Sequence, residues 1–290
     1  MPSIILVPTD FSQVAECAAM HAATIAQKSG EEVCLFHVID KTTKEDLKKK
    51  KEDEQYLETK LKRLAELVND KYKVTCTYKL KEGNIFSTIG EMAEECGASL
   101  IVLGTHGVQG IQRLVGAYAL KVVSSSKVPV IIVQHQLPSD TGYTRIVSPI
   151  DASVETKQKT MQTISFAKML NAKVYLFRQK GYDELVDDRI KLNLNFVKKH
   201  LNTHEIDFEV IEQETYTKNF SKSFIDYAKS IEANMIIILT TNEKGLKDII
   251  IGPEEQNVIN NEEGIPVMCV NPLQNIYVTD RLASTVNLSF

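Results

Sequence analysis

The sequence predicts an α/β protein built from two tandem, doubly wound domains, each a mostly parallel sheet with helices on both faces. Strand-like and helix-like segments alternate along the chain, which is typical of crossover units in parallel sheets. Four segments of the first half recur in the second half in the same order, which indicates a duplicated domain. A short segment rich in proline, glycine and polar residues separates the halves, as expected of a linker.

The repeat is carried by the strand-like segments and the turns that follow them. The matched pairs are IILVPTDFS with RIVSPIDAS, VCLFHV with VYLFRQ, GASLIVLGT with EANMIIILT, and KVPVIIVQ with GIPVMCVN. They begin at residues 4 and 145, 33 and 174, 97 and 232, and 127 and 264. Because the order and nearly the spacing are kept, we expect the two domains to share one fold.

The repeat also sets the expected domain boundaries. We predict a first domain at residues 1–137, a linker at 138–143 and a second domain at 144–273. Residues 274–290 lie outside the repeat, and their apolar end, VNLSF, favours a tail that docks, by pairing with an edge strand or by stabilising an oligomer, over a loose tail.

Five apolar or alternating runs predict the strands of the first half. They lie at residues 4–8, 33–39, 74–79, 100–103 and 130–133. The third run alternates with polar residues, so this strand is expected to be more exposed than the others.

Helices are predicted between these strands. Ser12 is expected to cap a first helix that ends at Gly30, and Asn84 to cap the helix before the fourth strand. The last helix of this half is expected from about Gly116 to Ser125. A long charged helix after the second strand carries one apolar stripe: Leu57, Leu61, Leu64 and Val68. The second helix of the second half carries another: Val186, Ile190, Leu194, Val197 and Leu201.

Composition excludes several classes of protein. The 290 residues are 43% apolar and 25% charged, and the net charge of −4 gives no general attraction to nucleic acid or anionic lipid. No apolar run approaches the ~20 residues needed to cross a bilayer, and Pro8 and Asp10 interrupt the first apolar run, so we expect no signal peptide. The five cysteines are scattered and form no CxxC pair, so we expect a reduced, cytoplasmic protein without a zinc or other metal site.

A ligand is expected at the carboxyl ends of the first and fourth strands, because doubly wound sheets bind ligands where the strand order reverses. Pro8, Thr9 and Asp10 follow the first strand, and the segment GTHG at residues 104–107 follows the fourth. Glycines allow a ligand to approach the backbone, and N–H groups beside the helix near Gly116 form a natural anion site. An Asp10 carboxylate could accept a hydrogen bond from an adenine amino group or a ribose hydroxyl.

Each of these residues also has a purely structural interpretation. Asp10 could cap the first helix, and the two glycines could form only a tight turn between a strand and a helix. His106 is expected to be a loop residue that faces solvent or phosphate, since no second histidine or cysteine is spaced to join it at a metal. His21 and His37 are expected to be packing or surface residues. A phosphate site here would lack the Walker lysine, because the sequence has no GxxxxGK[ST] motif.

Taken together, these motifs resemble the universal stress protein family in its tandem form. The resemblance rests on PTDFS, LFHVID, IVLGTHG, a Gly-Ala helix start and VPVIIV, and covers residues 1 to about 273. It implies a parallel five-stranded sheet per domain with strand order 3-2-1-4-5, of the flavodoxin-like or adenine-nucleotide-hydrolase-like kind. It also implies domain pairing through the last strands, a role in stress survival and, for some members, binding of ATP or AMP.

The resemblance also implies the positions of a nucleotide site. An adenine and ribose pocket would be lined by Pro8, Asp10 and Val38, beside Thr9. The phosphates would lie among Leu103, Gly104, His106, Gly107, Gly116 and Ala117. Nucleotide-binding members have nine residues between the second and third glycines and then Ser or Thr, whereas this sequence has eight and then Ala117. Loss of that hydroxyl would cost roughly 1.5–3 kcal/mol, which leaves weakened binding, a preference for AMP and no binding as alternatives.

The second domain departs further from this pattern. It keeps Pro149 and Asp151, but its loop reads LTTNE and has Glu243 about where the second glycine would be. A carboxylate there would repel phosphate, and Pro253, which follows Gly252, has no N–H to donate. We therefore expect this domain to be structural and not to bind nucleotide.

Two functions follow as hypotheses. The first is a stress-response sensor whose first domain binds ATP or AMP, and the second is a protein–protein adaptor that does not depend on nucleotide. We find no set of nucleophile, base and orienting group, so we expect no enzyme, or at most a weak ATPase. The apolar last strands would be aggregation-prone edges if unpaired. We expect them to pair within the chain, which is compatible with a homodimer but does not require one.

Overall fold

The computed structural model of the chain describes residues 3–105, 117–240 and 251–272. The predicted docking of the tail at 274–290 concerns residues outside this part.

The first half forms five parallel strands in the predicted order 3-2-1-4-5. They are β1 (Ile4–Pro8), β2 (Glu32–Ile39), β3 (Cys76–Glu82), β4 (Ala98–Gly104) and β5 (Val130–Val133). The strand expected at 74–79 is displaced along the chain, because β3 follows its pairing with β2, in which Val33 lies opposite Cys76 and Ile39 opposite Glu82.

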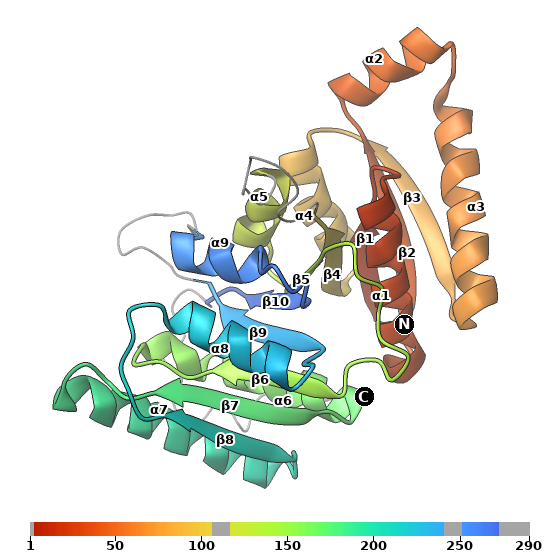
Figure 1. Cartoon of the computed structure of the whole chain (residues 1–290). Coiled ribbons are helices and arrows are strands. Elements are labelled where there is room, and N and C mark those ends of the chain that lie inside the picture. Colours follow the sequence, from red (N-terminus) through yellow and green to blue (C-terminus); the bar gives the residue numbers. More distant parts are fainter. Residues whose placement is uncertain (1–2, 106–116, 241–250, 273–290) are drawn as a thin grey trace.

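The second half repeats this strand order, as predicted. Its strands are β6 (Arg145–Pro149), β7 (Lys173–Gln179), β8 (Phe208–Gln213), β9 (Met235–Leu239) and β10 (Val267–Val270). The two sheets join through β5 and β10, which run antiparallel with Ile131 opposite Met268. Pairing of the last strands within the chain is therefore confirmed, and it produces one continuous ten-stranded sheet (Figure 1).

Helices cover both faces of this sheet. The helices of the first half are α1 (Gln13–Ser29), α2 (Lys41–Lys50), α3 (Glu54–Tyr72), α4 (Ile85–Glu95) and α5 (Ala117–Ser125). Those of the second half are a 3₁₀ turn, η1 (Val154–Lys157), and α6 (Lys159–Leu170), α7 (Glu184–Thr203), α8 (Phe220–Ser230) and α9 (Pro253–Ile259). Residues of α1, α3, α6 and α7 share one apolar core, and residues of α4, α5, α8 and α9 share the other.

The predicted helix ends in the first half are largely confirmed. The Ser12 hydroxyl accepts a hydrogen bond from the amide of Ala15, and Gly30 ends α1 in the left-handed conformation at φ 74°. The Asn84 side chain accepts from the amide of Phe86 and begins α4. Such caps depend on neighbouring residues only, which makes them readable from the sequence.

The single long helix expected after the second strand is wrong, because the structure has two helices there. Lys51 ends α2 at φ 57°, and the Asp53 carboxylate accepts from the amide of Tyr56 to begin α3. Figure 1 shows α2 at the far end of the first domain, joined to α3 by a sharp turn. A small apolar cluster that includes Leu47 and Leu57 holds the two helices beside β2.

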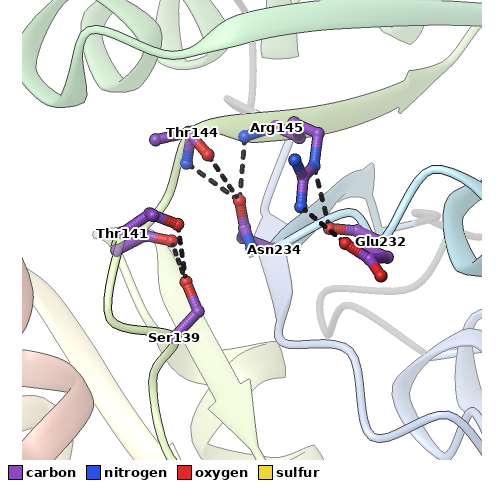
Figure 2. A network of polar contacts seen from close by, with 7 residues as sticks. Ser139, Thr141, Thr144, Arg145, Glu232 and Asn234 are labelled. Atoms are coloured by element: carbon purple, nitrogen blue, oxygen red, sulfur yellow. Dashed lines mark hydrogen bonds and ion pairs between the residues drawn. The ribbon is translucent and has the colours of Figure 1, made fainter.

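Polar contacts hold the start of the second domain against the turn that precedes β9 (Figure 2). The Asn234 side-chain oxygen accepts hydrogen bonds from the amide of Thr144 at 2.9 Å, its hydroxyl at 3.1 Å, and the amide of Arg145 at 3.0 Å. The Arg145 guanidinium also donates to the carbonyl of Glu232 at 3.0 Å. Strand β6 is thereby fixed to the turn that precedes β9.

His21 holds the linker from the side of the first domain. Its Nε2 donates to the carbonyl of Gln136 at 2.8 Å, so the neutral ring accepts the Tyr143 hydroxyl through Nδ1 at 2.6 Å. Both side chains are buried, and burial lowers the pKa of His21 to about 4. The residue expected to be a packing or surface histidine therefore anchors the linker.

Candidate functional site

A cavity of about 530 Å³ lies at the carboxyl ends of β1, β2 and β4. Six of the ten predicted site residues line it: Pro8, Thr9, Asp10, Val38, Leu103 and Gly104. His106, Gly107 and Gly116 lie outside the described residues, and Ala117 is the first residue of α5. Residues 8–10 and the described part of the second segment, Gly104 and Thr105, therefore line one space, as predicted for the switch point.

Local hydrogen bonds shape the loop after β1. The amide of Thr9 donates to the carbonyl of Phe36 at 2.8 Å, and its hydroxyl accepts from the amide of Phe11 at 3.0 Å. The Asp10 carboxylate accepts from the amide of Ser12 at 2.9 Å, while Ser12 itself caps α1. Asp10 is thus not the helix cap, and it stays exposed at the cavity.

Phe11 adopts a backbone conformation that is rare for a bulky residue. Its φ of 64° lies in the left-handed region, where a side chain other than glycine is strained. The ring packs 4.7 Å from the ring of His37, and the Lys60 ammonium lies 4.2 Å from its centroid. These contacts compensate the strain and hold the turn beside the cavity.

His37 also holds the loop after β1 in position. Its Nδ1 donates to the carbonyl of Thr9 at 2.7 Å, so a neutral ring leaves Nε2 as an acceptor. Burial lowers the pKa of His37, which keeps the ring neutral near pH 7. Sequence reasoning assigned His37 to packing or the surface and missed that it positions Thr9. Its place two residues before the end of β2, at the ligand-binding edge of the sheet, was the available signal.

Sequence reasoning also missed the contribution of α2. Asp40 caps this helix by accepting from the amide of Thr43 at 2.8 Å, and both residues line the cavity together with Thr42 and Asp46. Sequence reasoning placed this segment only within a long charged helix after the second strand. An Asp-x-x-Thr cap directly after a buried strand could have indicated that this helix begins at the cavity.

The cavity combines an apolar interior with carboxylates. Apolar side chains from β2, α4 and α5 line it, namely Phe36, Val38, Ile85, Ile89, Ala119 and Val122. Asp10, Asp40 and Asp46 also line it, and no lysine or arginine does so within the described part of the chain. This lining suits a flat apolar ring that carries hydrogen-bond donors, and it disfavours a dense negative charge.

Gly104 allows β4 to approach α1 closely. A Cβ atom at this position would lie 2.4 Å from the carbonyl oxygen of Val14 and 3.0 Å from the amide nitrogen of Ala15. Both atoms belong to the backbone, so no side chain could move aside to make room. The glycine is required by this packing whether or not a phosphate binds, as in doubly wound nucleotide-binding folds where one glycine serves helix–strand contact.

Comparison with known proteins agrees with this architecture. A model of the universal stress protein family matches residues 1–134 and 142–271. The chain belongs to the universal stress protein family. Two universal stress proteins of Methanocaldococcus jannaschii are similar in sequence. One is 33% identical over 141 residues, covering 45% of this chain and 81% of the relative. The other is 31% identical over 153 residues, covering 46% and 94%.

A solved universal stress protein shares the tandem fold. The crystal structure of the protein from Archaeoglobus fulgidus superposes with a TM-score of 0.74 and covers 93% of this chain and 98% of that chain. The sequence identity is 18%, so this likeness concerns the fold alone.

The second universal stress protein domain has a smaller cavity, of about 330 Å³, at the carboxyl ends of β6 and β9. Its Asp151 carboxylate accepts from the amide of Ser153 at 2.9 Å and from the hydroxyls of Ser153 and Thr156. Leu239 stands directly before Thr240 and so corresponds to Gly104, which stands directly before Thr105 in the first domain. Helix α6 begins only after the 3₁₀ turn η1. Pro253 occupies the first turn of α9, whereas Glu243 lies outside the described residues.

Neither a metal cluster nor a membrane span is found among the residues that the structure describes. Residues 3–105, 117–240 and 251–272 contain no group of three or more His, Cys, Asp or Glu side chains placed to hold a metal ion. Within the same ranges, every helix is too short or too polar to cross a bilayer.

Proposed function

We propose that the first domain, residues 1–137, binds an adenine nucleotide and acts as the sensor of a stress-response protein. The observation that carries the proposal is the cavity that brings Pro8, Thr9, Asp10, Val38, Leu103 and Gly104 together. The second domain, residues 144–273 beyond the linker at 138–143, serves mainly to pair with the first. Its cavity contains a buried lysine and no glycine at the end of β9.

The charge of the cavity favours AMP over ATP. Asp10, Asp40 and Asp46 supply three carboxylates, and the described lining offers no lysine or arginine to balance them. Every additional phosphate charge is repelled by these groups, and a unit pair at 4 Å interacts by about 1 kcal/mol even in water. AMP presents the same base and ribose with fewer charges, so it meets less repulsion.

We propose binding, with at most weak ATPase activity. The Nδ1 of His37 donates to the carbonyl of Thr9, and within the described residues its buried Nε2 has no hydrogen-bond partner, so no hydroxyl nucleophile is paired with the ring there. A catalytic set would require a nucleophile, a base and an orienting group in mutual contact. Turnover of ATP well above a protein-free control would contradict this part of the proposal.

A calorimetric titration of nucleotide-stripped protein with AMP and with ATP tests the proposal. We expect saturable binding of one AMP per chain, weakened about 10- to 100-fold by Asp10→Ala, because a hydrogen bond to a charged group contributes roughly 1.5–3 kcal/mol. Asp151→Ala removes the matching carboxylate of the second domain and should leave AMP binding unchanged. Absence of heat up to millimolar AMP would contradict the proposal, as would equal losses in the two variants.

An adaptor is the second candidate function, and the surface of α7 favours it. Leu185 and Leu192 are 74% and 65% exposed, and their spacing of two helical turns places them on one face. Such a stripe could contact a partner or a second copy in a homodimer. Light scattering on size-exclusion fractions would test self-association: a dimer that Leu192→Lys dissociates, with or without AMP, would support the adaptor. A monomer at all concentrations would argue against the homodimer.

A further inference from the structure

Lys159 is a buried cation in the cavity of the second domain. Lys159 is the first residue of α6, and only 4% of it is exposed. Its ammonium donates a hydrogen bond to the carbonyl of Pro149. It forms no ion pair within the part of the chain that the structure describes. The nearby Asp151 carboxylate is engaged by Ser153 and Thr156. An ammonium has three donors, so one carbonyl acceptor satisfies it incompletely.

This environment destabilises the charged ammonium relative to water. Burial lowers the pKa of Lys159 from 10.5 to about 8, against the opposing effect of Asp151. Its position at the amino end of α6 adds to this effect, because the helix dipole is positive there. A larger fraction of Lys159 is therefore neutral and nucleophilic near pH 7 than of an ordinary surface lysine.

The cavity that Lys159 lines has a volume of about 330 Å³ and combines apolar with acidic side chains. Lys159 and Pro149 both line it, and its apolar wall includes Phe220, Phe224 and Val258. Asp151, Glu155, Glu254 and Glu255 supply carboxylates to the same lining. This lining favours an apolar, uncharged molecule over an anion, and it would stabilise a cation that forms inside.

We propose that the second-domain cavity captures small neutral aldehydes, with Lys159 as the amine that forms an imine with them. The Nζ lone pair attacks the carbonyl carbon, a C–N bond forms, and one nitrogen proton moves to the former carbonyl oxygen, giving a carbinolamine. The C–O bond then breaks, the oxygen leaves as water with a proton taken from solvent, and the nitrogen lone pair forms the C=N bond. The protonated imine carries the positive charge that the surrounding carboxylates stabilise, and no oxidant or reductant is consumed.

This inference is independent of nucleotide binding. No lysine lines the first-domain cavity within the described residues, so the chemistry belongs to the second domain alone. It also gives that domain a role besides pairing with the first. A purely structural Lys159, which only caps the carbonyl of Pro149, would present no reactive amine to small molecules.

Reductive trapping on the intact protein tests the proposal. The protein is incubated at pH 7.4 with butanal and sodium cyanoborohydride, and butylated lysines are located by peptide mass spectrometry. We expect Lys159 to be labelled at least ten times faster than Lys222, whose side chain is 70% exposed. Glyoxylate, an anionic aldehyde, should label Lys159 at least ten times more slowly than butanal, while the two aldehydes should differ much less at Lys222.

Each result of this experiment either supports the proposal or overturns it. Labelling of Lys159 no faster than Lys222 in the unsubstituted protein would overturn the proposal without any mutation. Equal rates with glyoxylate and butanal would overturn the role assigned to the carboxylate lining. In Lys159→Arg, which keeps the donor to Pro149, the fast-labelled site should disappear while Lys222 reacts as before. Fast labelling that persists at another residue of the same peptide would refute the assignment to Lys159.

Discussion

Replacing Gly104 with alanine would perturb the contact that builds the first-domain cavity. The added Cβ would lie 2.4 Å from the carbonyl oxygen and 2.6 Å from the carbonyl carbon of Val14. Both distances are far below van der Waals contact, and both partners are backbone atoms of the first turn of α1. Either β4 or α1 must therefore move, and Val14 and Ala15, which line the cavity, would move with it.

The size of the effect follows from this geometry. Inserting a methyl group into close-packed surroundings typically costs about 1–3 kcal/mol. No flexible side chain can absorb the clash here, so we expect the upper part of that range, about 2–3 kcal/mol. For a chain of this size, each kcal/mol lowers Tm by roughly 2–4 °C. Displacement of α1 should also weaken AMP binding, because the cavity wall shifts.

Gly90→Ala is the matched control. Gly90 lies within α4, and a Cβ added there would meet no atom within 4 Å. The same substitution should therefore stabilise the protein by about 0.5–1 kcal/mol, because alanine favours a helix over glycine. Urea unfolding and thermal melting of both variants measure the difference. A Gly104→Ala protein as stable as the parent would refute the claim that β4 and α1 are in close contact.

Two further predictions concern the start of the second domain and the linker before it. Asn234→Ala removes the acceptor of three hydrogen bonds from Thr144 and Arg145. It should lower the free energy of unfolding in urea by about 1–3 kcal/mol. An unchanged urea midpoint would contradict this prediction. His21 has a folded-state pKa of about 4 against an ordinary 6.5, so the unfolded chain binds its proton first as the pH falls. His21 alone should therefore lower stability by about 2 kcal/mol between pH 7.5 and pH 5. His21→Leu should remove most of that slope, and an unaltered slope would rule out His21 as its cause.

The fold was predictable because its signals are local and repeated. The strands are apolar runs bounded by turns, and Ser12, Gly30 and Asn84 mark helix ends by their own side chains or backbone. The order of strands and their pairing within the chain follow from the family resemblance. The pairing is also favoured physically, because β5 and β10 would otherwise expose apolar edges.

Two features of the fold were not predictable in this way. The break between α2 and α3 lies in the run KKKKEDE, which has no apolar residue whose spacing could reveal a change of helix. The start of β3 was placed two residues early. The alternation of VTCTYKLKE continues past the predicted end, and pairing with β2, not the pattern, sets its bounds.

The candidate site likewise contains residues that the sequence could predict and residues that it could not. Residues at strand ends, such as Asp10 and Gly104, could be placed because topology alone brings those ends together. Asp46 was missed because it reaches the cavity only through the path of α2. Lys159 was missed because its burial depends on the 3₁₀ turn that delays the start of α6, and such a turn has no strong sequence signature.

The most direct test of the central claim is hydrogen–deuterium exchange of the stripped, full-length protein with and without AMP. Binding in the first-domain cavity predicts slower exchange in peptides that contain Thr9 to Ala15 and Val38 to Asp46, because several residues of each range line the cavity. Peptides that contain Asp151 and Lys159 should exchange at the same rate in both samples. Protection confined to the second domain, or no protection anywhere at saturating AMP, would contradict the assignment of the first domain as the nucleotide sensor.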